Sequence, residues 1–239
     1  MYASKKTSMK ILAMDCAAGA CSAAVAGGGE VLAHCCQSMA RGHAEALMPM
    51  VEAVLQASGT SYATLDLVAV TVGPGGFTGV RIGLAAARGI ALAGALPLIG
   101  VNTLECLAHG VSETERGGRA VVAVLDSKRA DLYVQSFDGT LAPLGPPAAA
   151  MPGDLEAILP DGPIIFVGDA TERAIASIPG GRAISSMAPA TPDARVLAIL
   201  AGARRGEMQA KGRECPSAEP LYLRPPDATI PADGGRLRP

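Results

Sequence analysis

Histidine is the side chain in this sequence best suited to bind a catalytic metal, and the chain contains three of them. His43 opens a segment with helical periodicity, so a second ligand on the same face should stand four residues later. That position is Leu47, and neither His34 nor His109 has ligand spacing to His43. We therefore expect no metal site, and we reject metallopeptidase activity and metal-dependent group transfer.

Two aspartates at the ends of predicted strands are the candidates for a nucleotide site. Asp15 is followed by the small residues Cys16–Gly19, a partial match to a turn whose backbone N–H groups can approach phosphates. Asp126 is followed by Ser127–Arg129, which has no glycine and two bulky cations. Lys128 and Arg129 could still bind an anion, but a solvated turn is the favoured interpretation. We expect a vestigial nucleotide site at Asp15, Asp126 and Lys128, and no bound cofactor.

A third candidate is the glycine-rich loop Gly73–Gly76, which precedes a predicted helix as phosphate-binding loops do. It is not a Walker A loop, because Phe77-Thr78 stands where that motif needs a lysine. A tight structural turn is therefore favoured, and Thr78 is the expected N-cap of the helix. No Ser/His/Asp or Cys/His arrangement can be argued either, so we expect no catalytic residues.

Hydrophobic periodicity predicts an α/β protein whose two halves begin alike. The first half predicts strands at 10–14, 21–26 and 30–37, a helix at 43–57, a strand at 65–72, a helix at 78–93 and a strand at 96–101. The second half again starts with a strand ending in aspartate, a turn and another strand, and then becomes less regular. This repetition suggests a duplicated unit, as in the actin, Hsp70 and sugar-kinase architecture. We expect an N-terminal extension (1–8), an N-terminal lobe (9–103), a C-terminal lobe (104–210) and a polar, proline-rich tail (211–239).

Composition limits the possible partners. The formal charge is −2, the aromatic content is 3% and there is no Trp. The sequence therefore predicts neither a basic surface for phosphates nor aromatic side chains for base stacking, so any action on RNA should proceed through a partner protein. The six cysteines show no CxxC pattern and are expected to be reduced, and neither a secretory signal nor a membrane-spanning segment is visible. These features predict a cytoplasmic protein.

The run Thr71–Gly83, TVGPGGFTGVRIG, closely resembles the signature of the TsaB (YeaZ) family. Agreement in order and spacing extends over about Met9 to Arg224, dense in the first half and thinner between 141 and 205. Gly76 and Val80 stand where Ser and Leu are more usual. The further segments that carry the resemblance are Ile11–Asp15, His43–Pro49, Gly100–Ala108, Leu125–Ala130 and Tyr222–Arg224.

The resemblance implies an actin/Hsp70-like (ASKHA) fold of two βββαβα-type lobes, the second degenerate. It also implies a non-catalytic subunit in the synthesis of N6-threonylcarbamoyladenosine at the adenosine next to the anticodon of tRNAs. In that family the TsaB-like subunit pairs with a catalytic paralogue, TsaD, and a small ATPase, TsaE, joins them. TsaC supplies the threonylcarbamoyl-adenylate. Without its paralogue, the chain is expected to form a homodimer through the same surface.

We expect the first two helices to form this docking surface, although periodicity leaves open which residues face the chain's own sheet. Arg81 and Arg88 share another side of the second helix and either meet acids across an interface or are solvated. The predicted interface residues are His43, Leu47, Met50, Val51 and Val54 on the first helix, and Phe77, Gly79, Arg81, Gly83 and Ala86 on the second.

The sequence leaves two alternatives to the predicted non-catalytic function. The first is an ATP-dependent small-molecule kinase of the same fold, which would require tight nucleotide binding despite the missing glycines after Asp126. The second is an M22-type, glycoprotease-like peptidase, which would require metal ligands that the sequence lacks.

Overall fold

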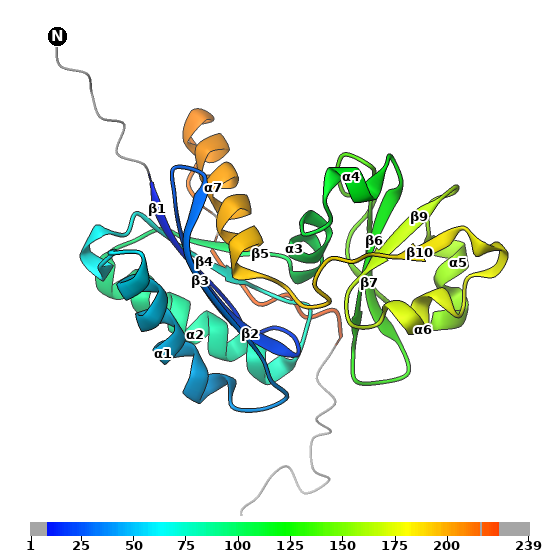
Figure 1. The fold of residues 1–239 in the computed structure, drawn as a ribbon, viewed down its shortest axis with the longest axis horizontal. Coiled ribbons are helices and arrows are strands. Elements are labelled where there is room, and N and C mark those ends of the chain that lie inside the picture. The colour runs from blue at the N-terminus through cyan, green and yellow to red at the C-terminus, as the bar shows by residue number, and fades with distance from the viewer. Residues whose placement is uncertain (1–8, 216, 225–239) are drawn as a thin grey trace, which may run out of the picture.

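The computed structural model describes residues 9–215 and 217–224, which form two five-stranded sheets with helices on their faces (Figure 1). The predicted N-terminal extension, residues 1–8, lies outside the described residues, as does the part of the predicted tail from 225 to 239. Within the described part of the chain, no helix is long and apolar enough to cross a membrane.

The first sheet has the strand order β3-β2-β1-β4-β5. β1, β2 and β3 are antiparallel neighbours, and β4 and β5 run parallel to β1. Gly28 and Gly29 turn the β2–β3 hairpin with φ angles of 64° and 89°, in the left-handed region that favours glycine. The strands are β1 (Lys10–Asp15), β2 (Ala20–Gly27), β3 (Glu30–Ser38), β4 (Leu67–Thr71) and β5 (Leu98–Val101).

Helices cover both faces of this sheet. Because successive strand residues point to opposite faces, Leu12 and Met14 pack under α1 (His43–Ala57) and α2 (Phe77–Gly94), whereas Ile11 and Ala13 pack under α7 (Ala194–Ala210). The short 3₁₀ turn η1 (Tyr62–Thr64) connects α1 to β4. The expected helix at 43–57 is confirmed to the residue, with Pro49 inside it.

The second sheet, in the order β10-β9-β6-β7-β8, repeats the first strand for strand and in the same relative directions. Its helices α5 and α6 have 4 and 5 residues where α1 and α2 have 15 and 18. The duplicated α/β fold with a degenerate second lobe is therefore confirmed. The elements are α4 (Glu113–Arg116), β6 (Ala120–Asp126), β7 (Leu132–Phe137), β8 (Ala148–Ala150), η2 (Pro152–Asp154), α5 (Leu155–Ile158), β9 (Ile164–Val167), α6 (Thr171–Ile175), η3 (Pro179–Gly181) and β10 (Ala183–Ser185).

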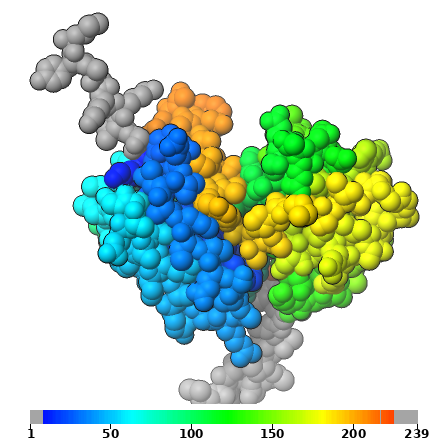
Figure 2. All heavy atoms as spheres, viewed as in Figure 1, coloured from blue at the N-terminus to red at the C-terminus, as the bar shows by residue number. Residues whose placement is uncertain are grey.

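The two halves exchange one helix each. Helix α3 (Thr103–His109) follows β5, but its Leu104 and Leu107 pack against the second sheet. Helix α7 follows β10, but its Leu197 and Ala201 pack against the first sheet, as the orange of α7 beside the blue of the first half shows (Figure 2). Residues 194–210, which we placed in the C-terminal lobe, therefore belong to the core of the first sheet because their apolar side fits its second face. The predicted domain boundaries otherwise stay a prediction.

The expected cap of α2 is wrong. The helix begins at Phe77 rather than Thr78, and Gly76 occupies the N-cap position without a side-chain hydrogen bond to the helix end. The Gly76 N–H instead donates to the Ala17 carbonyl at 2.8 Å. The start of α2 is thus fixed by a contact with the β1–β2 turn rather than by a capping side chain.

Candidate functional site

The three most distinctive segments of the sequence meet at the β1–β2 turn, residues Cys16–Gly19. The glycine-rich loop reaches it through the Gly76 N–H, and His43 at the start of α1 places its Nε2 3.2 Å from the Ala18 carbonyl oxygen. Asp15 stabilises the turn from its buried side, since its Oδ1 accepts the Ala17 N–H at 3.1 Å. His43 therefore has a contact within its own chain, which favours a structural role over docking.

Glycines permit the close approach of α2 to this turn. A Cβ atom at Gly79 would lie 2.0 Å from the Cys16 carbonyl oxygen, and one at Gly75 would lie 2.2 Å from that of Ala17. Gly83 is buried, and a Cβ added there would lie 3.4 Å from a Val70 methyl group. Gly79 and Gly83 therefore serve an internal contact, which corrects their assignment to the partner surface. The tight-turn interpretation of the loop is supported, because its backbone is engaged by the protein itself.

Asp15 is fully buried at the carboxyl end of β1. Its Oδ1 accepts hydrogen bonds from Thr71 Oγ1 and Ala17 N, while its Oδ2 has no hydrogen-bond partner among the described residues. Burial raises the pKa of this carboxyl to about 7, even though the two hydrogen bonds oppose the rise. The carboxyl thus anchors the turn and is enclosed by protein.

Asp126 has the equivalent position at the end of β6, but its surroundings differ. Lys128 Nζ lies 3.2 Å from one carboxylate oxygen and Arg173 Nη1 3.1 Å from the other. Burial alone would raise the pKa of Asp126, but hydrogen bonds from Lys128 and the charge of Arg173 outweigh it and lower the pKa. Asp126 and Lys128, both expected at the vestigial nucleotide site, are thus in contact with each other, while Arg173 was missed because it stands 47 residues away on α6. Lys128 of this turn and Arg173 of α6 therefore pair with a carboxylate of their own chain.

Most of the predicted α1 interface residues lie in the core. Leu47, Val51 and Val54 are at most 2% exposed and Met50 is 6% exposed, packed with Met14 and other residues of the first sheet. These four are corrected from docking residues to core residues, because the amphipathic stripe of α1 faces its own sheet.

The free side of α2 carries small and apolar side chains. Ala85, Gly89 and Ala93 are exposed and recur every four residues, with Ile82, Ala86 and Ile90 half-buried beside them. A Cβ at Gly89 would meet nothing within 4 Å, so no contact within the chain requires glycine there. We call Ile82, Ala85, Ala86, Gly89, Ile90 and Ala93 the α2 stripe. Of its members only Ala86 was predicted, although the small-xxx-small spacing of 85, 89 and 93 was a readable signal.

Arg81 and Arg88 bind a segment from the other end of the chain. Arg81 stacks 3.7 Å over the Phe77 ring and donates to the Tyr222 hydroxyl at 2.9 Å, and Arg88 donates to the Ala218 carbonyl at 2.6 Å. Leu221 N–H also donates to Val72 at 2.7 Å. The segment that holds Ala218, Leu221 and Tyr222 is therefore docked on α2 and on Val72, the residue that follows β4. Of the predicted interface residues, Phe77 (54% exposed) and Arg81 are exposed, and His43, Gly79 and Ala86 are half-buried. Of these three, His43 and Gly79 lie against the β1–β2 turn, and Ala86 belongs to the α2 stripe.

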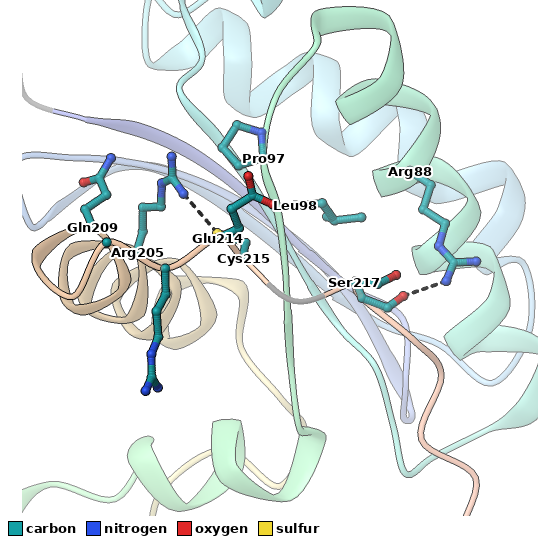
Figure 3. Close-up of a pocket in the computed structure, with 11 residues that line it drawn as sticks. Arg88, Pro97, Leu98, Arg205, Gln209, Glu214, Cys215 and Ser217 are labelled. Carbon is teal, nitrogen blue, oxygen red and sulfur yellow. Dashed lines mark hydrogen bonds between the residues drawn. The ribbon is translucent and has the colours of Figure 1, made fainter.

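A groove of about 560 Å³ lies where the end of α7, the start of β5 and residues 212–215 and 217–218 meet (Figure 3). Arg205 points to Cys215, with Nη1 3.2 Å from Sγ, and Arg88 enters from the opposite side. None of the predicted site residues lines this groove. Among the described residues, no group of three or more His, Cys, Asp or Glu side chains could hold a metal ion.

Comparison with known proteins places these features in context. A family model described as TsaD, tRNA N6-adenosine threonylcarbamoyltransferase, matches residues 30–232. The tRNA threonylcarbamoyladenosine biosynthesis protein TsaB of Escherichia coli is 42% identical over 125 residues, which cover 52% of this chain and 53% of that protein. The chain thus spans about half the length of this relative.

Solved structures extend the likeness to nearly the whole chain. YeaZ from Pseudomonas aeruginosa superposes with a TM-score of 0.77 and 29% identity, covering 90% of this chain and 100% of YeaZ. The activator of the 2-hydroxyisocaproyl-CoA dehydratase from Clostridium difficile, with bound ADPNP, superposes with a TM-score of 0.53 at 11% identity. The second match, which covers 87% of this chain, shows the actin-like fold alone.

Proposed function

This chain belongs to the TsaB (YeaZ) family, and on that premise we propose that it is a non-catalytic subunit in the formation of N6-threonylcarbamoyladenosine on tRNA. Its principal partner is a catalytic TsaD-like paralogue, and it activates that paralogue by pairing with it. A TsaE-like ATPase joins the pair, and the tRNA is contacted only through the complex. The formal charge of −2 supports this indirect role in RNA binding.

The observation that carries the proposal is the α2 stripe, and Gly89 in particular. A glycine in a helix interior costs about 1 kcal/mol relative to alanine, and here no neighbouring atom offsets that cost. A glycine between two exposed alanines leaves a flat surface on which a second helix can lie closely. A paralogue of the same fold would present an equivalent helix, so the contact can be pseudo-symmetric, and a second copy of this chain can replace the paralogue in a homodimer.

The polar groups of the former nucleotide site support a non-catalytic role. The carboxylate of Asp126 is bound by Lys128 and Arg173, and that of Asp15 holds the β1–β2 turn from a buried position. A bound nucleotide would have to displace these contacts before it could use either group. We therefore propose that neither position supplies catalysis, and that the complex works in the cytoplasm, where its tRNA substrates are.

The test uses two glycines in matched surroundings. Gly89 on α2 and Gly206 on α7 are both exposed helix residues, and a Cβ added at either would meet no atom within 4 Å, so we expect the free chain to accept a leucine at both positions. We expect Gly89→Leu to weaken capture of the TsaD-like paralogue by at least tenfold and to reduce tRNA threonylcarbamoylation in a reconstituted assay. Gly206→Leu should leave both unchanged. Normal pairing and activity of Gly89→Leu would refute the proposed surface, and full activity without this chain would refute the function.

A further inference from the structure

Two buried thiols face each other across the β1–β2 turn. The antiparallel register of β1 and β2 ends with Asp15 opposite Ser22, so Cys16 and Cys21 form the next facing pair. Their Sγ atoms lie 3.4 Å apart, and the two residues are 2% and 0% exposed. We infer that Cys16 and Cys21 are a redox-active dithiol that closes to a disulfide across this turn.

The geometry permits closure with a small movement. A disulfide needs an S–S distance of about 2.05 Å, so the sulfur atoms must approach by roughly 1.4 Å. The other cysteines lack this arrangement. Cys35 and Cys36 are consecutive on β3 and point to opposite faces, Cys106 donates to the Asp193 carbonyl, and Cys215 accepts from Arg205. Closure is therefore expected to be specific to the pair at the turn.

The hydrogen bond between the thiols gives them different roles. When Cys16 donates its S–H to Cys21, that bond raises the pKa of Cys16 and lowers the pKa of Cys21. Cys21 is then the better nucleophile and Cys16 the resolving thiol. Because both are buried, we expect a small oxidant such as hydrogen peroxide to react and a bulky disulfide such as oxidised glutathione to be excluded.

The reaction with hydrogen peroxide balances in two steps. The Cys21 thiolate attacks one peroxide oxygen, the O–O bond breaks, and the departing hydroxide takes the proton released by Cys21, giving a sulfenic acid and water. Cys16 sulfur then attacks the Cys21 sulfur, the S–O bond breaks, and the departing hydroxide takes the Cys16 proton to form a second water. Two thiols and one peroxide thus yield one disulfide and two waters.

Closure would fix the turn on which the starts of α1 and α2 rest. Gly76 N–H donates to the Ala17 carbonyl, and Met39 N–H donates to the Gly19 carbonyl at 3.0 Å. A turn that is cross-linked by the disulfide should unfold locally less often, so the amides of Gly76 and Met39 should exchange more slowly with solvent. This gives a readout in the free chain that is independent of any partner protein and of the proposed function.

The experiment treats the folded full-length chain with hydrogen peroxide, then unfolds it, alkylates free thiols and maps peptides without reduction. Lys10 and Arg41 bound a tryptic peptide that holds Cys16, Cys21, Cys35 and Cys36, so the mapping uses a Cys35→Ser/Cys36→Ser variant. We expect this peptide to lose two hydrogen masses, to resist alkylation and to regain both thiols with dithiothreitol. Adding Cys21→Ser should abolish closure.

A second measurement uses the wild-type chain, so that the test remains valid if the Cys35→Ser/Cys36→Ser variant does not fold. Peptic digestion of the wild-type chain separates the turn from β3, and should show the same loop together with slower amide exchange at Gly76. The inference is overturned if both thiols remain alkylatable after peroxide treatment, if they oxidise to sulfinic acids without closing, or if closure leaves the exchange of Gly76 unchanged.

Discussion

Gly79→Ala adds one methyl group where α2 approaches the β1–β2 turn, and we predict a substantial loss of stability. The new Cβ would lie 2.0 Å from the Cys16 carbonyl oxygen and 3.2 Å from its carbonyl carbon, well inside a non-bonded contact of roughly 3.5 Å. Both neighbours are backbone atoms, so no side chain can rotate away. The helix start must retreat, and the Gly76 N–H to Ala17 hydrogen bond must lengthen or break.

The size of the effect follows from two opposing contributions. Overpacking costs up to about 3 kcal/mol in well-packed regions, and the helix propensity of alanine returns about 1 kcal/mol relative to glycine. We therefore expect the free energy of unfolding to fall by about 2 kcal/mol. For a chain of 239 residues this corresponds to a decrease in Tm of roughly 4–8 °C.

The assay is urea denaturation followed by far-UV circular dichroism, with the m-value checked for constancy. Gly89→Ala on the same helix is the matched control, since its Cβ would meet nothing within 4 Å. It should raise the free energy of unfolding by up to about 1 kcal/mol. Wild-type stability of Gly79→Ala, within about 0.5 kcal/mol, would refute the close approach of α2 to the turn. Equal losses in both variants would show that the contact is not the cause.

Two further predictions concern buried groups. Since burial raises the pKa of Asp15 to about 7 from an unfolded value of about 3.9, the folded chain binds more protons between these values and loses stability as pH rises through that window. Asp15→Asn should remove this part of the slope, which urea midpoints at pH 5 and pH 8 would reveal; an unchanged slope would contradict it. Val54→Glu places an unpaired charge at a 2% exposed core position and should unfold the chain, visible by circular dichroism, whereas a folded variant that only loses its partner would return Val54 to the interface.

Local sequence signals predicted the elements well. Short apolar runs bounded by turn residues gave the strands of the first sheet, and the 3.6-residue period gave α1 as His43–Ala57. The repeated strand, aspartate and turn at Asp15 and Asp126 indicated the duplication that the two sheet orders confirm. These features depend on neighbours in the chain, which is why a single sequence contains them.

Long-range contacts were not predictable in the same way. Arg81 binds Tyr222, 141 residues away, and Arg173 binds Asp126 across 47 residues, so neither partner leaves a local pattern. The exchange of α7 onto the first sheet has the same origin. The stripe of Leu47, Val51 and Val54 was visible, but its apolar character could not distinguish the chain's own sheet from a partner, and the sheet is the nearer apolar surface.

The glycines of α2 divide according to the space around them, and this division separates the side of the helix that packs on its own chain from the side that we propose for docking. At Gly79 and Gly83 a Cβ would meet Cys16 or Val70, so the first half of the helix lacks side chains on the side that faces its own chain. At Gly89 a Cβ would meet open space, so the second half of the helix lacks a side chain at this position on its exposed side. A helical glycine without an internal contact costs stability in the free chain. Gly206 on α7 is equally open, so open space alone does not mark an interface. We assign the Gly89 side of α2 to the partner because the small and apolar residues Ala85, Ala86 and Ile90 surround it, whereas the charged residues Arg205 and Glu207 flank Gly206.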